Sequence, residues 1–120
     1  MKNYVGQNGE IVAKNHLISK GFNIILTNFT SRFGEIDIIC DDEEYIIFVE
    51  VKSKINSFPI SCLERIDCSK EKKILKTIDV YLSNNFSKKQ PRIDVIEVVF
   101  IANSETIINH IENVFFQNYI

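Results

Sequence analysis

The spacing of hydrophobic and polar residues along the chain predicts helices and strands in the order helix, three strands, helix, two strands. Apolar residues recur at helical spacing within residues 3–20, and Gly21 follows them as a C-terminal cap residue. A second helix is expected at about 69–84, where Ile74 and Ile78 fall on one side. Shorter β-rich runs predict strands at 22–29, 35–40, 45–53, 92–101 and 106–116. This order predicts an α/β fold in which a mixed sheet packs between helices.

Polar segments separate the predicted elements without forming a long linker. Residues 54–61 are expected to form a loop because Pro59 cannot donate to a sheet ladder, and residues 84–91 form another. With 120 residues, the chain is expected to be a single domain spanning 1–120. No apolar run approaches the roughly 20 residues of a membrane span, and the first residues lack a signal-peptide core. A cytoplasmic protein without membrane association is therefore expected.

Charge is distributed unevenly along the chain. The net charge is −2, but residues 52–92 contain ten Lys/Arg and four Asp/Glu, a balance of +6. The other residues contain four Lys/Arg and twelve Asp/Glu, a balance of −8. This asymmetry suits a phosphate-rich ligand held near a cation site, although an unevenly charged solvated surface gives the same totals.

The three cysteines do not form a recognisable ligand or redox motif. Cys40, Cys62 and Cys68 are odd in number and show no CxxC spacing. Reduced, structural thiols are therefore expected rather than a disulfide framework or a zinc site.

A predicted hairpin brings several acidic residues together. The second and third predicted strands are joined across residues 41–44, so the numbers of paired residues are expected to sum to 85. This register places Glu35 across from Glu50 and makes Asp37 a diagonal neighbour of Glu50, with β-carbons roughly 7–8 Å apart. Opposed carboxylates repel each other, so a positive group is expected between them.

Two interpretations of these acids remain open at this point. In the first, Asp37, Glu50 and Lys52 form a cross-strand salt-bridge cluster at a solvated end of the sheet. In the second, the two carboxylates share a divalent cation, and an all-oxygen site suits Mg²⁺ or Mn²⁺ rather than zinc. A lysine beside such a metal can orient, or help to deprotonate, a water that attacks a phosphate.

The combined motifs resemble the PD-(D/E)XK nuclease superfamily. The resemblance is carried by the E-x-K of Glu50-Val51-Lys52, by Asp37 thirteen positions earlier, and by Glu10 on the first helix. More narrowly, the chain is similar to the bacterial YraN-like family of predicted nucleases, which is similar to archaeal Holliday-junction resolvases. The matching segments are Gly6-x-x-Gly9-Glu10 with Ala13, Gly21-Phe22 with Asn28, Gly34-Glu35-Ile36-Asp37, Phe48-Val49-Glu50-Val51-Lys52, Lys70 with Tyr81-Leu82, Arg92-x-Asp94-Val95, and residues 107–115.

The resemblance implies a restriction endonuclease-like fold and a catalytic site. In such a site Asp37 and Glu50 bind the metal with help from the Val51 carbonyl. Lys52 positions the nucleophilic water, and Glu10 completes the site from the first helix.

Four positions depart from the family pattern. Ile36 stands where the superfamily name expects proline, and Lys54 stands where arginine is usual. Pro59 replaces a glycine, and Thr30 replaces an arginine, which leaves Arg32 as a stand-in. These departures affect expected substrate contacts and loops rather than the expected metal ligands.

Basic residues on and around the second helix are the expected nucleic-acid contacts. A row of cations can follow a phosphate backbone, although any amphipathic helix also needs a polar face. The predicted contacts are Lys54, Lys70, Lys73, Lys76 and Arg92. The two histidines, His16 and His110, lack a metal-ligand spacing and are expected to be structural or surface residues.

The sequence and the resemblance together predict a metal-dependent endonuclease-like protein that hydrolyses DNA, at branched or repair intermediates. A domain of this size is expected to need a second copy, as a homodimer, to engage a duplex or junction. The alternative is a non-catalytic nucleic-acid-binding or adaptor domain that keeps the nuclease fold. A purely structural protein partner is a third hypothesis, and it predicts no nucleic-acid binding.

Overall fold

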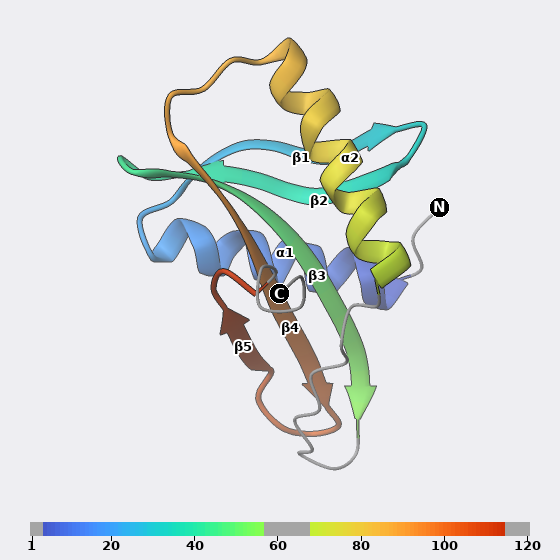
Figure 1. Ribbon diagram of the computed structural model, residues 1–120. Coiled ribbons are helices and arrows are strands. Elements are labelled where there is room, and N and C mark those ends of the chain that lie inside the picture. Colours follow the sequence, from blue (N-terminus) through green and yellow to red (C-terminus); the bar gives the residue numbers. More distant parts are fainter. Residues whose placement is uncertain (1–3, 57–67, 115–120) are drawn as a thin grey trace.

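The computed structural model describes residues 4–56 and 68–114, which form two helices and one five-stranded sheet (Figure 1). The elements in chain order are α1 (Tyr4–Ser19), β1 (Asn23–Ser31), β2 (Gly34–Asp41), β3 (Tyr45–Asn56), α2 (Cys68–Asn84), β4 (Gln90–Ile101) and β5 (Ile107–Ile111). No helix within these described residues is long and apolar enough to cross a membrane. The predicted α/β class is confirmed, and the arrangement is consistent with a restriction endonuclease-like fold.

The sheet is mixed, as the sequence predicted, and its strands follow the order β1-β2-β3-β4-β5. The pairs β1–β2, β2–β3 and β4–β5 are antiparallel, whereas β3 and β4 run parallel. Parallel neighbours need a crossover connection, and α2 lies in the segment that joins them. Strand β3 is the middle strand of the sheet, and its pairing with β4 extends from Tyr45 to Asn56.

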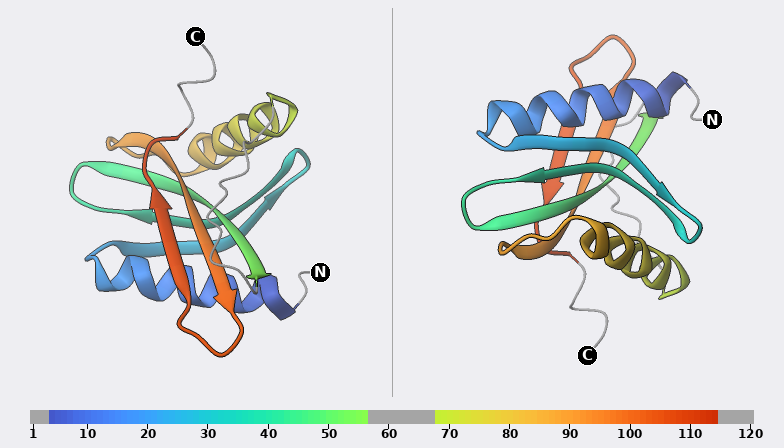
Figure 2. Two further views of the ribbon diagram at one scale, coloured as in Figure 1. Left: turned by 90° about the horizontal axis from the view of Figure 1, so that it is seen from below. Right: turned by 90° about the horizontal axis from the view of Figure 1, so that it is seen from above.

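The two helices cover opposite faces of the sheet (Figure 2). Each face contributes a buried apolar cluster, and alternation along β3 divides its side chains between the clusters. In β2 the alternation is interrupted, because Ile36 and Ile38 are two residues apart and belong to different clusters. On the α2 side the buried residues are Ile36, Ile39, Ile46, Phe48, Ile74, Ile78, Tyr81 and Ile93. On the α1 side they are Ala13, Leu17, Ile38, Cys40, Ile47, Val49, Ile96 and Val98.

The predicted hairpin exists, but its predicted register is wrong by two residues. The observed partners run from Asp41 with Ile46 to Ile38 with Val49, so that paired numbers sum to 87. The turn is centred one residue later than expected, on Glu43 and Glu44, and the Asp42 N–H donates to the Tyr45 carbonyl at 3.0 Å. The Asp42 carboxylate also accepts the N–H groups of Glu44 and Tyr45, at 2.8 and 2.7 Å. An aspartate side chain that accepts hydrogen bonds from N–H groups two and three residues later stabilises a short turn at that point in the chain.

The corrected register changes which carboxylates meet. The last regular pair of the β2–β3 ladder joins Ile38 to Val49, and the next residues along the two strands are Asp37 and Glu50. The expected opposition of Glu35 and Glu50 is therefore wrong, and Glu35 instead pairs with Thr30 of β1. A shift of two residues preserves the face of each side chain, so the grouping of Asp37 with Glu50 survives the error.

Two element boundaries also differ from the prediction. Strand β3 continues to Asn56, although a loop was expected from residue 54, and Pro59 lies outside the described residues. Strand β5 ends at Ile111 rather than near residue 116. Asn113 has a left-handed backbone with φ of 53°, and its N–H donates to Asp94, so the chain turns there.

Cys40 behaves as the sequence predicted for a structural thiol. It is free and fully buried, and burial raises the pKa of its thiol to about 12. The side chains of Cys62 and Cys68 lie outside the described part of the chain.

Candidate active site

Two carboxylates meet where the β2–β3 ladder ends. Asp37 is 4% exposed, and its Oδ2 accepts a hydrogen bond from the Val51 N–H at 2.8 Å. The Asp37 carboxylate thus accepts the Val51 N–H just beyond the last regular backbone pair, which joins Ile38 to Val49. Asp37 and Glu50 both line a pocket of about 470 Å³ between the sheet and α2. The structure thus brings together the two residues that the sequence singled out.

The surroundings of Glu50 disfavour the charged form of its carboxylate. Burial raises the pKa of Glu50 above its ordinary value, repulsion from Asp37 raises it further, and Lys70 and Lys52 oppose the shift. Lys70 of α2 places its Nζ 3.0 Å from Glu50 Oε1. Partial burial alone would lower the pKa of Lys70, but Glu50 and Asp37 raise it overall. Two acids buried side by side need a neighbouring positive charge, and the ammonium group of Lys70 supplies it at Glu50.

Lys52 follows Glu50 on the same face of β3. It lines a second, smaller pocket of about 260 Å³ together with Glu50, Val51 and Lys70. Glu50 belongs to both pockets, so its carboxylate lies between the α2 pocket and the pocket that contains Lys52.

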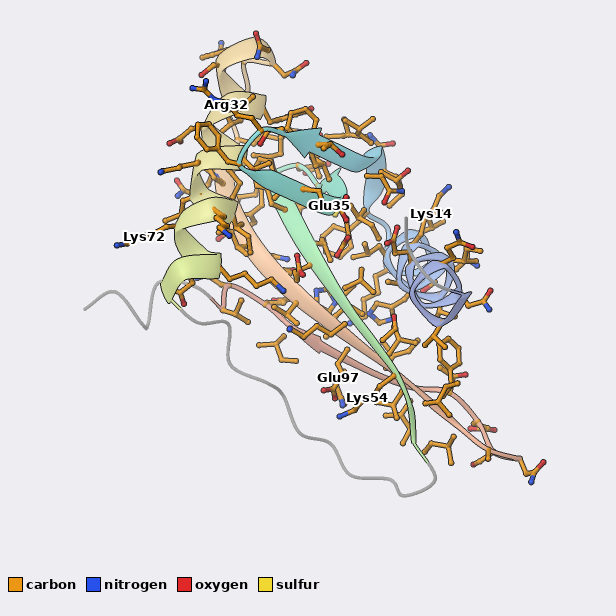
Figure 3. The ribbon with its side chains drawn as sticks, turned by 90° about the vertical axis from the view of Figure 1, so that its right-hand side faces the viewer. Lys14, Arg32, Glu35, Lys54, Lys72 and Glu97 are labelled. Carbon is orange, nitrogen blue, oxygen red and sulfur yellow. The ribbon has the colours of Figure 1, made fainter. Side chains whose placement is uncertain are left out.

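Lys54 lies further along the same strand. Its Nζ is 3.9 Å from Glu97 Oε2 on β4, and these side chains lie together in Figure 3. Glu97 also accepts a hydrogen bond from the Asn109 amide at 2.9 Å. Lys54 therefore remains near the candidate site, with a partner on the neighbouring strand.

Glu10 lies in a different pocket from Asp37. It lines a pocket of about 720 Å³ between α1 and the strands β1 and β2, together with Lys14, Asn28 and Glu35. Glu35 lines both this pocket and the Asp37 pocket, so the two pockets adjoin. Within the described residues, no group of three or more His, Cys, Asp and Glu side chains is arranged to hold a metal. Glu10 thus lines the neighbouring pocket rather than the pocket of the carboxylate pair.

Gly9 explains how α1 lies close to β3 at this end of the sheet. A Cβ atom at this position would overlap the Ser53 hydroxyl and lie 2.6 Å from Ser53 Cβ. Such a distance leaves no room for any larger residue without movement of the helix or of Ser53. Glycine permits this close approach of the two backbones, and the approach places Glu10 beside the sheet.

The predicted lysines of α2 lie on one side of the carboxylate pocket. Lys70 and Lys73 line it, and Lys73 and Lys76 are exposed. Lys72 points away from the sheet in Figure 3. The helix thus presents a basic edge to the carboxylate pocket.

Phe33, in the turn between β1 and β2, also lines this pocket. The Arg32 guanidinium lies 4.8 Å from the centre of the Phe33 ring, and the Lys76 ammonium lies 5.3 Å from it. An aromatic ring with two neighbouring cations therefore borders the carboxylates.

Arg92 is not part of this basic edge. It is 8% exposed and forms two hydrogen bonds of 2.9 Å with Asp94. Its guanidinium also lies against the rings of Phe22 and Tyr45, which belong to the α1 side of the sheet. A buried, paired arginine on this face packs inside the fold, so we exclude it from the candidate nucleic-acid surface.

The two histidines are in contact, although they are 94 residues apart in sequence. His16 Nε2 lies 3.2 Å from His110 Nδ1, and His110 Nε2 lies 2.8 Å from Asp94 Oδ2. Burial lowers the pKa of His16, and His110 and Lys20 lower it further. The pair links α1 to β4 and β5, so the structural interpretation from the sequence holds, with a partner that only the fold reveals.

The donor set of the carboxylate pair fits a hard divalent cation. Mg²⁺ is commonly bound by one or two carboxylates and completes its shell with water and substrate phosphate oxygens. Asp37 and Glu50 supply two carboxylates in a partly enclosed pocket, and Lys70 already supplies a positive group at Glu50 Oε1. Sequence reasoning gave Lys70 only a nucleic-acid role, because nothing in its spacing reveals an ion pair with a strand twenty residues away.

A family model described as "Uncharacterised protein family UPF0102" matches residues 9–98. A UPF0102 protein of Clostridioides difficile is 46% identical over 112 residues, which cover 92% of this chain and 95% of the relative. A UPF0102 protein of Caldanaerobacter subterraneus is 41% identical over 118 residues, which cover 95% and 96%. A third, from Fervidobacterium nodosum, is 41% identical over 108 residues, covering 90% and 79%. The matched region contains both carboxylates and the lysines that surround them.

Proposed function

The chain belongs to the UPF0102 family, and we propose that it is a divalent-metal-dependent endonuclease of the PD-(D/E)XK kind that hydrolyses DNA. The observation that carries the proposal is the meeting of Asp37 and Glu50 at the end of the β2–β3 ladder. Lys52 follows on the same strand face, and lysines of α2 line the same pocket. Metal-assisted phosphodiester hydrolysis needs acids that bind the metal. It also needs a group that orients the attacking water and cations that bind the phosphates, and the lysines can serve in these two roles.

Asp37 and Glu50 would hold Mg²⁺ or Mn²⁺, with the Val51 carbonyl as a further oxygen donor. A bound divalent ion of this kind polarises a phosphoryl oxygen and lowers the pKa of a coordinated water. The raised pKa of Glu50 supports this assignment, because a second positive charge would relieve its burial and its repulsion from Asp37.

The lysines divide between two roles in this proposal. Lys52 orients the attacking water, since it lies two residues after Glu50 on the same strand face and lines the pocket that Glu50 shares. Lys70 neutralises Glu50 in the metal-free protein, and it would be available to a substrate phosphate if a cation neutralised that carboxylate instead. Glu10 and Glu35 contribute from the neighbouring pocket, where they can hold water.

The basic edge of α2 is the proposed contact for the nucleic-acid backbone. Lys70, Lys73 and Lys76 project from one helix beside the carboxylate pocket, with Lys54 on the adjoining strand. Phosphate contacts of this type position a substrate without reading its sequence. As further parts of the proposal, the protein acts in the cytoplasm on branched or repair intermediates, and a second copy supplies the other half of a junction-binding surface.

The test is cleavage of end-labelled single-stranded, linear duplex and four-way-junction DNA in Mg²⁺ or Mn²⁺. Glu50→Gln, purified in parallel, controls for contaminating nuclease, because it keeps the shape of the side chain and removes its charge. Metal-dependent cleavage by the native protein that is lost in Glu50→Gln is the expected result. Tight DNA binding without cleavage, unchanged by Mg²⁺ and by Glu50→Gln, contradicts the proposal and favours the adaptor function.

A further inference from the structure

The turn between β1 and β2 carries an aromatic side chain at the edge of the carboxylate pocket. Phe33 lines that pocket together with Asp37, Glu50 and Lys73. It lies four residues before Asp37 on the path of β2, which corresponds to about 13 Å along an extended strand. A group held at Phe33 is therefore close to the carboxylates without occupying their position.

The turn is fixed against α2 by a set of hydrogen bonds. The Phe33 N–H donates to Ser31 Oγ at 3.0 Å, and Ser31 Oγ lies 3.1 Å from Thr77 Oγ1. Thr77 is fully buried on α2 and donates to the Lys73 carbonyl at 2.8 Å. A Cβ added at Gly34 would lie 3.5 Å from Thr77 Oγ1, so the turn also packs closely on the helix. The position of the Phe33 backbone is thus set before any ligand arrives.

Cations surround the ring of Phe33. The exposed Arg32 places its guanidinium 4.8 Å from the ring centre, and Lys76 of α2 places its ammonium 5.3 Å from the same point. Aromatic rings flanked by cations form the stacking platforms of proteins that bind single-stranded nucleic acid. A planar guanidinium and a planar base stack on an aromatic face in similar ways, so a base can replace Arg32 there.

We propose that Phe33 stacks an unpaired base of the substrate strand, while Arg32 and Lys76 bind the phosphates on either side of it. This inference rests on the proposed function for its substrate, and it deepens that function by naming the substrate class. A base inside a duplex already has neighbours on both faces, so only an unpaired base can offer a face to Phe33. The substrate is therefore DNA with a single-stranded segment a few nucleotides from the scissile bond, such as a flap, a gap or an opened junction.

The first test combines a protein variant with a substrate change. Phe33→Leu keeps an apolar side chain of similar bulk and removes the aromatic face, and Phe33→Tyr retains that face as a matched control. Native cleavage of a flap substrate is compared with cleavage of the same substrate made abasic at each of several single-stranded positions. Loss of the stacked base is expected to weaken the native reaction roughly 5- to 150-fold at one position and to leave Phe33→Leu unaffected there. Equal losses in the two proteins at every position contradict the stacking contact.

A second test does not depend on cleavage. The same single strand carries the fluorescent base 2-aminopurine at that position, or at each position in turn, and is titrated with protein in buffer that contains no divalent metal. Stacking on Phe33 is expected to change the fluorescence with the native protein and Phe33→Tyr, and not with Phe33→Leu. The same change with Phe33→Leu, or no DNA binding by any of the three proteins, overturns the inference. A Phe33-dependent change without DNA cleavage supports base binding while the proposed nuclease activity fails.

Discussion

At the scale of single residues, Glu50 is the position where stability and function are in conflict. It lies in a partly buried site close to another acid, and its pKa is raised by both, while Lys70 opposes the shift. A raised pKa means that the folded protein binds the Glu50 proton more tightly than the unfolded chain does. Ionised Glu50 therefore destabilises the metal-free fold, which is understandable if the charge is retained to bind a cation.

Glu50→Gln is expected to raise the melting temperature of the metal-free protein at neutral pH. Gln removes the buried charge, and the exposed part of Lys70 remains hydrated when its partner is lost. Because the pKa is raised in the folded state, the advantage of Gln should appear as pH rises above the ordinary value of 4.5 and should vanish below it. Melting curves in a chelator at a series of pH values measure the difference, and a variant that is less stable throughout contradicts this account of Glu50.

At the scale of secondary-structure elements, α1 is held to the sheet at both of its ends. Near the N-terminal end, Gly9 lies against Ser53 of β3. Near the C-terminal end, His16 contacts His110 of β5, which in turn contacts Asp94 of β4. The first contact positions Glu10 beside the candidate site, and the second joins the helix to the far edge of the sheet.

Gly9→Ala is expected to destabilise the protein by about 1–3 kcal/mol, because the added methyl group overlaps Ser53. In a Ser53→Gly background the same change should cost much less, since the overlapping atoms are gone. Urea denaturation of the four proteins gives the coupling energy. Equal effects of Gly9→Ala in both backgrounds would show that the close approach of α1 to β3 is not what requires glycine.

Asp94→Asn is expected to cost about 3–5 kcal/mol at pH 7, because it leaves Arg92 buried without its charge partner. Burial alone would raise the pKa of Asp94, but hydrogen bonds from His110, Arg92 and the Asn113 N–H lower it overall. The ionised carboxylate therefore adds stability above about pH 4, and this stability is lost as pH falls through the lowered native pKa.

Urea denaturation at pH 7 and near pH 3 should therefore show a large difference between Asp94→Asn and the native protein that shrinks in acid. Glu112→Gln is the matched control, since Glu112 is exposed and lies 3.8 Å from the same guanidinium. It should change stability by no more than about 0.5 kcal/mol. A difference for Asp94→Asn that is the same at both pH values contradicts the role given to its charge.

Much of the fold could be predicted from the sequence because its periodic patterns are local. The helices, the five strands and the face on which Asp37 and Glu50 lie all follow from apolar spacing. The hairpin register could not be predicted, since it depends on how the Asp42 carboxylate caps the turn. The contacts of Lys70 with Glu50, of Arg92 with the Tyr45 ring and of His16 with His110 were likewise hidden, because each joins elements that are distant in sequence.

At the scale of the whole molecule, the small net charge hides an uneven distribution, in which positive side chains are concentrated beside the candidate site. The chain carries −2 overall, while the lysines of α2 gather beside the pocket that Asp37 and Glu50 line. An acidic remainder limits non-specific attraction to duplex DNA, and the basic edge keeps a local site for phosphates. Arg92 does not add to this edge, because its charge is neutralised within the fold.

Lys73→Ala and Lys76→Ala are each expected to weaken single-stranded DNA binding and to reduce its salt dependence. Each lost phosphate contact should lower the slope of log affinity against log salt by roughly 0.7. Lys20→Ala changes an exposed residue on the turn after α1, the helix that covers the face opposite α2, and it should leave the slope unchanged. Fluorescence anisotropy at several salt concentrations measures the slopes, and an equal effect of all three variants would place the DNA elsewhere.

The central claim is that Asp37 and Glu50 share one divalent cation. The most direct measurement is the equilibrium binding of Mn²⁺, counted from the electron paramagnetic resonance signal of the free ion. The native protein is expected to bind Mn²⁺, and Asp37→Asn and Glu50→Gln are each expected to lose that binding, while Glu112→Gln retains it. Unchanged Mn²⁺ affinity in both carboxylate variants would contradict a shared site and remove the basis of the proposed chemistry.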